Sequence, residues 1–465
     1  MVLSRLWSAF VIVAVVVAGI KFIASDNYRT IFNDLVVGQS GDTVTIRHAI
    51  PAEISTFLTN KPNNAIFNDN GIYYKKISES ETQIFRIQHS DGIIGTAKTA
   101  VEISLGLIGI MTLFMGFMSI AERAGGIRFL SRIIQPFFSK IFPEIPKNHP
   151  AFGLMTLNFS ANLLGLDNAA TPFGLRAMES LQQLNPDKNR ASNAQIMFLC
   201  LHASGLTLIP VSIIAIRAAQ HSVNPTEIFL PTLIATFCAT MAALIIVSIK
   251  QKINLLQPKI LVFIGTVSAI ISALVILLVK MNSAELDTAN KLISNGLILF
   301  IFFVIILGGI WKKINIFDSF IDGAKDGVMV CVRIIPYLVG MLIAISLLRT
   351  SGVFDLVINA MKHLTALLGA DPRFVDGLPT ALIKPFSGSA ARGMMVDTIT
   401  NLGVDSFAGR LSAVLQGSSD TTFYVIAVYF GAVSVKNTRY TIGAMLLADL
   451  VGITVSILMA YMFFG

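Results

Sequence analysis

Two glycine-containing segments concentrate polar side chains in a chain that is otherwise strongly apolar. The first, NFSANLLGLDNAATPFG over residues 158–174, supplies Asn158, Ser160, Asn162, Asp167, Asn168 and Thr171. The second, KPFSGSAARG over residues 384–393, supplies Lys384, Ser387, Ser389 and Arg392. Such groups can hydrogen-bond a solute or hold an ion, and burying them without partners is costly. We therefore predict that both segments line a binding site.

Two further polar segments are expected to complete that site. HASGLTL over residues 202–208 supplies His202 and Ser204, and QGSSDTTFY over residues 416–424 supplies Gln416, Ser418, Ser419, Asp420 and Thr421. We expect Asp420 and Asp167 to serve ion coupling and the other named residues to bind substrate. A carboxylate in a span costs about 2.5 to 3.5 kcal/mol, so Asp420 should be paired or protonated, with Lys384 as its expected partner.

A structural interpretation of the same residues stays open. Single hydroxyls such as those of Ser204 and Thr422 often bond to their own helix and bind nothing else. An ion pair of Asp420 and Lys384 could serve only to fix the two broken segments in place.

Composition places the chain among polytopic membrane proteins. It is 54% hydrophobic and only 13% charged, with a mean hydropathy of +0.72, whereas soluble domains carry about 25% charged residues. Nine apolar segments are long enough to cross a bilayer. They cover residues 7–24, 100–120, 193–216, 228–249, 259–279, 292–310, 330–348, 411–431 and 441–464. The fold class predicted is therefore an all-α polytopic membrane protein.

The charge pattern argues for a lipid partner and against nucleic acid. The net charge of +8 comes from Lys and Arg at the ends of the apolar segments, where the positive-inside rule places them. The three cysteines lack the spacing of a zinc site or a disulfide framework. We expect no metal site and no cofactor beyond a coupling H⁺ or Na⁺.

The one long polar section, residues 25–96, predicts a small extramembrane α/β insert. DTVTIRH is typical of a strand, and PAEISTFLTN begins like a helix with Pro51 in its first turn. GIYYKKISESETQIFRIQH alternates like two strands around a Ser-Glu turn.

The two halves of the remaining chain repeat one order of parts. Each has an amphipathic lead-in, a span, an interfacial segment, a polar broken segment and a span that opens with small polar residues. Gly125 and Ser160 recur in the second half as Gly352 and Ser387, and Ser204 and Thr207 recur as Ser418 and Thr421.

Loop charges favour a re-entrant path for residues 158–174 and an inverted second half. We predict a cytoplasmic N-terminus and an external insert. One conflict follows from this topology, since it places Arg349, Lys362, Arg373, Lys384, Arg392 and Arg410 on or toward the outside, against the charge rule.

The predicted organisation has five parts. They are an N-terminal transmembrane anchor (1–24), the insert (25–96), a first repeat (97–249), a connecting transmembrane helix (250–291) and a second repeat (292–465).

The motifs also resemble a known family. HPAFGLMTLNFSANLLGLDNAATPFGLRAMESLQQLNP, within residues 97–249, resembles spore maturation protein A. LPTALIKPFSGSAARGMM and LQGSSDTTFYVIAVYFGAVSVKNTRY, within residues 292–465, resemble spore maturation protein B. The resemblance implies a fusion of two members of the nucleoside-recognition or Gate-domain group, in a bacterial cytoplasmic membrane, with two Gate-type repeats. It also implies an association with spore-core dehydration. The insert at 25–96 departs from the family pattern.

Three functions are compatible with these patterns. The leading one is a secondary transporter or solute pathway with a midplane site between inverted repeats, coupled to H⁺ or Na⁺ through Asp420. The second is a non-transporting scaffold that recruits a partner through the insert. The third, an intramembrane hydrolase using a Ser with Asp420 or His202, lacks any nucleophile-elbow or HExxH pattern, so we expect no enzyme. The expected partners are a small solute and the bilayer, and a homo-oligomer is compatible with the sequence.

Overall fold

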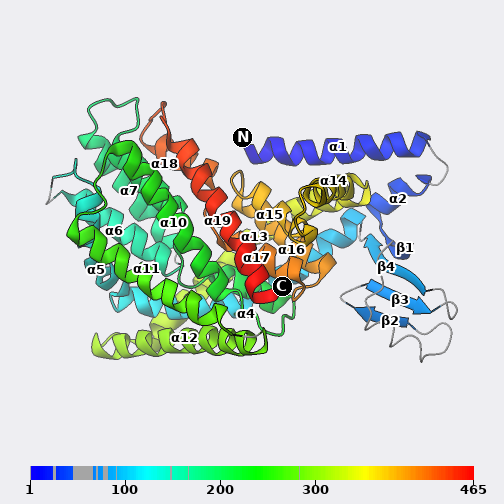
Figure 1. Cartoon of the computed structure of the whole chain (residues 1–465), viewed down its shortest axis with the longest axis horizontal. Coiled ribbons are helices and arrows are strands. Elements are labelled where there is room, and N and C mark those ends of the chain that lie inside the picture. The colour runs from blue at the N-terminus through cyan, green and yellow to red at the C-terminus, as the bar shows by residue number, and fades with distance from the viewer. Residues whose placement is uncertain are drawn as a thin grey trace.

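The computed structural model places a helical membrane body beside a small sheet (Figure 1). It describes residues 2–24, 28–45, 66–69, 72–76, 82–90, 92–146, 149–165, 167–281 and 283–465. Within these ranges seven helices are long and apolar enough to cross a membrane: Trp7–Ala24, Gly92–Arg123, Phe229–Gln251, Ile260–Leu278, Thr288–Trp311, Ile316–Thr350 and Thr441–Phe464. The chain is therefore a multi-pass membrane protein, as its composition predicted.

Two of the nine predicted spans are broken helices. Segment 193–216 forms α8 (Asn193–Ala203) and α9 (Val211–Ala219), and segment 411–431 lies within α17 (Phe407–Gly417) and α18 (Thr422–Ala432). In the first break, Gly205 has a positive φ of 60° and Pro210 has no N–H to continue a helix. Each of these two predicted spans is therefore divided between two helices.

Both halves have the same succession of elements. The first contains α4 (Gly92–Arg123), α5 (Gly126–Ile141), α6 (Pro150–Leu163), α7 (Asp167–Leu184), α8, α9 and α10 (Phe229–Gln251). The second contains α13 (Ile316–Thr350), α14 (Val353–Leu367), the 3₁₀ turn η2 (Pro372–Asp376), α15 (Leu378–Ile383), α16 (Gly388–Leu402), α17, α18 and α19 (Thr441–Phe464). The repeated glycines Gly125 and Gly352 both cap a helix with positive φ, of 85° and 76°.

Matching helices of the two halves lie against each other in opposite directions. Arg123 at the end of α4 pairs with Asp322 in the second turn of α13, at 2.9 Å, and Met115 of α4 faces Gly323 of α13. At the end of α10, the Gln251 amide donates to Tyr440, which directly precedes α19, at 2.9 Å. The long pairs α4 with α13 and α10 with α19 are thus antiparallel.

Three helices flank these pairs. Helix α1 (Val2–Ala24) packs alongside α13, and its Trp7 side chain donates to the Gly340 carbonyl at 2.8 Å. Helix α12 (Ser283–Trp311) packs alongside α4, and its Phe302 ring stacks on Phe117 of α4 with ring centroids 3.9 Å apart. The two lie along opposite edges of the body in Figure 1. Helix α11 (Pro258–Val279) lies between the halves in sequence. Only 6% of the residues in its apolar segment Ile260–Leu278 are buried.

The described part of the insert contains a strand at each of the three predicted segments and a fourth, at residues 66–69, that was not predicted. After the short helix α2 (Ile31–Val36) come β1 (Gln39–Thr45), β2 (Ile66–Asp69), β3 (Ile72–Lys76) and β4 (Thr82–Ser90). They form an antiparallel sheet in the order β1-β4-β3-β2, at the edge of the body in Figure 1. The helix predicted at PAEISTFLTN and the Ser-Glu turn lie outside the described residues.

The close contact of α4 with α13 generates a prediction for Gly323→Ala. A Cβ at this position would lie 2.3 Å from the Met115 carbonyl oxygen, so the two backbones must separate. We expect a loss of about 1 to 3 kcal/mol of stability, measured as a lower melting temperature of the purified protein. The control is Gly265→Ala in α11, where no atom lies within 4 Å of the added Cβ. Equal melting temperatures for the two variants would contradict the prediction.

Candidate functional site

The two helix breaks meet at a main-chain hydrogen bond. The Asp420 N–H, in the break between α17 and α18, donates to the Ala203 carbonyl at the end of α8, at 2.7 Å. Gly205 lies against the same peptide, with an ideal Cβ position 3.5 Å from the Asp420 nitrogen. Segments more than two hundred residues apart in sequence thus share one crossing point. The sequence placed HASGLTL and QGSSDTTFY in the same site, and the structure brings them into contact.

Each break also contacts the turn of a helical hairpin from its own half. In the first half the Leu208 N–H donates to the Leu163 carbonyl at 2.8 Å, where α6 turns into α7. Gly165 in that turn has a φ of 72°, and a Cβ there would lie 2.6 Å from the Ile209 carbonyl oxygen. In the second half the Phe423 N–H donates to the Pro385 carbonyl at 2.9 Å, between α15 and α16. All four polar segments therefore meet.

An amide and imidazole cluster occupies the first-half side of the crossing point. The Nδ1 atom of His202 lies 2.7 Å from the Asn162 Nδ2 atom and 3.1 Å from the Asn158 Oδ1 atom. Its Nε2 atom lies 3.8 Å from the Asp420 carboxylate. His202 is 5% exposed, whereas the Asp420 side chain is 46% exposed. The cluster therefore links a buried base to an accessible acid.

Tyr429 of α18 closes this cluster. Its ring centroid lies 4.9 Å from that of His202, and its hydroxyl lies beside Asn158 and Thr171. Asn158 also donates to the Ala170 carbonyl at 2.7 Å, which ties α6 to α7. The sequence analysis did not select Tyr429, because an aromatic residue in an apolar span carries no signal of its neighbours.

A second cluster lies on the other side of the crossing point. The Lys384 ammonium, on a side chain that is 8% exposed, donates to the Gln416 carbonyl at 2.5 Å. The Gln416 amide donates to the Gly388 carbonyl at 3.4 Å, and a Cβ on Gly388 would lie 2.7 Å from the Thr421 hydroxyl. Among the described contacts, the base next to Asp420 is His202, whereas Lys384 was the predicted partner.

Several predicted hydroxyls have local partners. Ser160, Ser204 and Ser418 donate to the carbonyls of Thr156, Leu201 and Leu415 in their own helices. Ser387 accepts from the Ala390 N–H and caps α16, while Ser389 and Arg392 are half-buried in its first turns. The Ser419 hydroxyl faces Asp449 of α19. The side chains of Asp167 and Asn168 lie outside the described residues.

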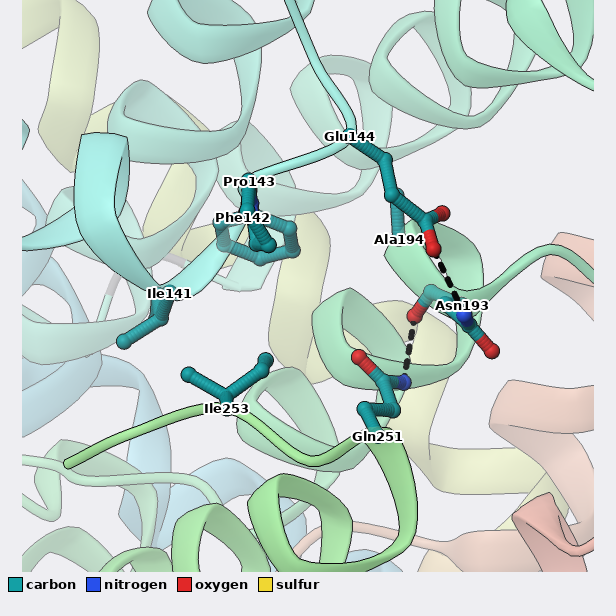
Figure 2. Close-up of a pocket in the computed structure, with 8 residues that line it drawn as sticks. All are labelled: Ile141, Phe142, Pro143, Glu144, Asn193, Ala194, Gln251 and Ile253. Atoms are coloured by element: carbon teal, nitrogen blue, oxygen red, sulfur yellow. Dashed lines mark hydrogen bonds between the residues drawn. The ribbon is translucent and has the colours of Figure 1, made fainter.

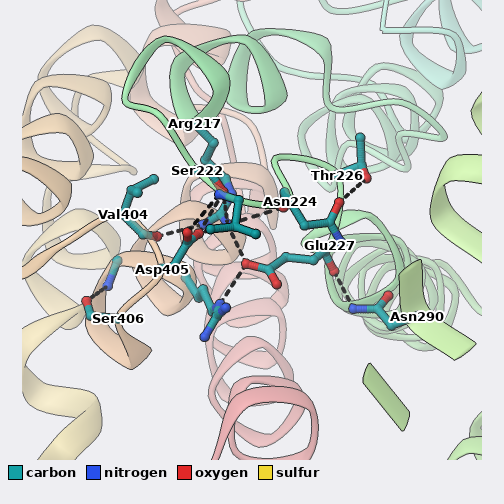
Figure 3. A network of polar contacts seen from close by, with 12 residues as sticks. Arg217, Ser222, Asn224, Thr226, Glu227, Asn290, Val404, Asp405 and Ser406 are labelled. Atoms are coloured by element: carbon teal, nitrogen blue, oxygen red, sulfur yellow. Dashed lines mark hydrogen bonds and ion pairs between the residues drawn. The ribbon is translucent and has the colours of Figure 1, made fainter. Parts of the chain in front are cut away.

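Away from the crossing point, an ionic seam joins the halves through residues 217–227 and 404–410. Arg217 of α9 is fully buried and pairs with both Glu227 and Asp405, the latter at 3.0 Å. Arg410 of α17 donates to Glu227 at 2.6 Å, and the Ser222 hydroxyl donates to Asp405 at 2.6 Å. Figure 3 shows the side chains of Arg217, Glu227 and Asp405 converging from the two halves.

Asp405 is held as a carboxylate in this seam. Burial alone would raise its pKa, but hydrogen bonds from Ser222 and the Val223 N–H, with the charges of Arg217 and Arg410, outweigh burial. The pKa of Asp405 therefore lies below its ordinary value.

A main-chain seam joins the halves at the opposite ends of α10 and α19, through residues 185–193 and 433–440. The Ala191 N–H donates to the Asn437 carbonyl and the Asn437 N–H donates to the Asn189 carbonyl, each at 2.9 Å. A small cavity with room for about one water molecule lies next to this seam, between Phe142, Asn193 and Gln251 (Figure 2).

Comparison with known proteins identifies relatives for both halves. A family model described as nucleoside recognition (Gate) matches residues 104–220 and 331–436. The chain is similar to spore maturation protein B of Bacillus subtilis (strain 168), with 46% identity over 35% of this chain and 89% of that protein. It is also similar to spore maturation protein A of the same organism, with 43% identity over 34% of this chain and 80% of that protein. No solved structure matches significantly.

The ionic seam generates a prediction for Asp405→Asn. Because its pKa is lowered in the folded state, Asp405 stabilises the fold above the ordinary Asp pKa of about 3.9, and this contribution is lost as pH falls through the lowered value. We expect Asp405→Asn to cost about 1 to 2 kcal/mol of stability at neutral pH. We also expect its melting temperature to fall less steeply than that of the parent as the pH is lowered (the acid limb of the plot of melting temperature against pH). The control is Asp326→Asn, at an exposed carboxylate of α13. An unchanged acid limb in Asp405→Asn would contradict the assignment.

Proposed function

Because the chain belongs to the family of spore maturation proteins A and B, with most of the length of each relative matched in one polypeptide, we propose that it is a secondary transporter or solute pathway for a small polar or charged solute. One observation carries the proposal: two broken helices and two hairpin turns meet at the hydrogen bond from Asp420 to Ala203. Broken helices in a bilayer are tolerated where they are buried in protein or line a wet cavity, and transporters bind solutes and ions at such places.

The halves are proposed to be inverted repeats. Their common order of elements and the antiparallel packing of α4 with α13 and of α10 with α19 support this arrangement. In the predicted topology, with a cytoplasmic N-terminus, the insert and the ionic seam face outward and the main-chain seam faces the cytoplasm. The two hairpins then enter from opposite sides as re-entrant segments.

Four of the six basic residues that conflict with the charge rule have carboxylate partners. Arg349 pairs with Asp397, Lys362 with Asp376 at 2.8 Å, and Arg373 with Asp371 at 2.7 Å. Arg410 pairs with Glu227 in the ionic seam. The positive-inside rule counts Lys and Arg whether or not a carboxylate lies beside them, so the orientation is proposed from the antiparallel packing of the two halves and not from these pairs.

The two seams offer a mechanism for alternating access. Each seam closes one end of the α10 and α19 pair, so opening a path from the crossing point to either side requires separating one seam while the other holds. The broken helices carry the site between them. The partly exposed Asp420, next to His202, is the proposed entry point for a coupling H⁺ or Na⁺.

The side chains at the crossing point suit a solute with several hydrogen-bonding groups. Asn158, Asn162 and Gln416 offer amides, His202 offers an imidazole, and Lys384 offers a positive charge. A nucleoside, the ligand class in the description of the matching family model, falls within this range, as does a zwitterionic amino acid derivative.

A non-transporting scaffold remains the second candidate, and two observations favour it. The breaks touch each other directly, and the cavity in Figure 2 lies at the main-chain seam, away from the crossing point. In that case the polar segments only hold the halves together, and the insert recruits a partner.

The proposal predicts ligand-dependent stabilisation of the purified protein. We would screen nucleosides, amino acids, dipeptides, dicarboxylates and polyamines by thermal shift. A ligand at about one hundred times its dissociation constant should stabilise the parent by about 2.7 kcal/mol. Asn162→Ala and Asp420→Asn should lose this shift, because each removes a group at the crossing point.

The matched control is Asn401→Ala, whose amide bonds to Asp397 away from the breaks, at 2.9 Å. This variant should keep the ligand shift even if its own melting temperature falls. A screen without any ligand, in which Asn162→Ala and Asp420→Asn merely melt earlier, would move the scaffold ahead of the transporter.

A further inference from the structure

Asp449 is a buried carboxylate that the site described above does not use. It is the single charged residue of α19, a span of 24 residues, and it is 4% exposed. A carboxylate in the middle of a span costs about 2.5 to 3.5 kcal/mol even on the mildest scale, so an ionisable residue there suggests a functional role. The sequence carried this signal as a lone Asp in MLLADLVG.

The contacts of Asp449 connect an unbroken helix to a broken one. The Thr422 hydroxyl, at the first position of α18, donates to the Asp449 Oδ2 atom at 2.6 Å. The Ser419 hydroxyl, from the preceding break, also faces this carboxyl group. Both hydroxyls sit on the segment that meets Ala203. The charge on Asp449 therefore influences how tightly the break is held to α19.

Ionisable groups from three other parts of the chain interact with Asp449. Lys384, beyond the end of α15, acts on it through space and not through a hydrogen bond, as does Asp420 from the break. From α8 the neighbour is the buried Cys200 thiol. Helix α10, which also packs on α19, has its one charged residue, Lys250, in its last turn, beside the main-chain seam.

Asp420 and Asp449 differ in access to water. The Asp420 side chain is 46% exposed and lies 3.8 Å from the His202 Nε2 atom, whereas Asp449 is buried behind Ser419 and Thr422. The break thus places an accessible acid and a base on one side and a buried acid on the other. Hydroxyl groups, which can donate and accept, stand between them.

We propose that Asp449 takes up and releases the coupling proton, and that Asp420 with His202 forms its entry. A hydronium ion breaks one O–H bond and becomes water, while the proton forms an O–H bond to a carboxylate oxygen of Asp449, and no other bond changes. Neutral Asp449 accepts more weakly from Thr422, so protonation loosens the break from α19. The coupling role of Asp449 rests on the proposed transport function. The proposal that Asp449 binds a proton does not depend on transport.

The test is infrared difference spectroscopy of the purified full-length protein between about pH 8 and about pH 5, because buried carboxyls can titrate far above their ordinary range. In the parent we expect the carbonyl band of a protonated, buried carboxylic acid to grow as pH falls. Asp449→Asn should lose this band. Asp397→Asn is the matched control: Asp397 is 7% exposed but paired with Arg349, so the band should remain.

A band that persists in Asp449→Asn, or a parent without any such band, would overturn the proposal. If Asp449→Asn does not fold, Thr422→Val gives a second reading. Losing a donor to the charged form should move the midpoint of the band to higher pH by about one unit, and an unmoved midpoint would count against Asp449. The solute thermal shift, measured on the same variants, separates the outcomes: a solute shift without the band removes only the proton site, and a band without any solute shift removes only the transport role.

Discussion

The peptide groups of the two broken helices must find partners inside the protein, because hydrocarbon offers none. The structure meets this requirement reciprocally. The Asp420 N–H bonds to the Ala203 carbonyl. The N–H groups of Leu208 and Phe423 then donate to carbonyls in the hairpin turn of their own half, at Leu163 and at Pro385. Neither break can be satisfied by its own helix alone. The meeting of the halves, the hairpin turns and the convergence of polar side chains all depend on these few main-chain hydrogen bonds.

The two seams occupy matching places in the two halves but use different chemistry. One joins the α9–α10 loop to the α16–α17 loop through buried charges, centred on Arg217. The other joins the α18–α19 loop to the α7–α8 loop through backbone hydrogen bonds, at Asn189 and Asn437. A buried charge cluster is expensive to separate unless its members find new partners or protons, whereas backbone groups at a loop can exchange their partners for water. The two ends of the molecule therefore respond differently to pH and salt.

The sequence predicted the elements better than the side-chain partners. Apolar length predicted the spans, glycine and polar residues located the four segments that meet, and the repeated Gly125 and Gly352 marked equivalent helix starts. Hydropathy marked 193–216 and 411–431 as spans but did not locate the breaks within them, because the hydrogen bonds that hold each break come from other segments. The sequence analysis also paired Asp420 with Lys384, since both are charged and in one half. His202 comes from the other half, and its approach to Asp420 depends on how the halves cross.

Helix α11 has no counterpart in the repeated order of elements, and most of its surface faces away from the protein. Its effect is on association. If the two halves were separate proteins, they would have to meet by diffusion in the membrane. Here the connecting helix holds the halves at a high effective concentration, so their association becomes an intramolecular step. The fused chain fixes a one-to-one ratio of the halves. The interface between α4 and α13 therefore needs less binding free energy than an interface that holds two separate subunits together.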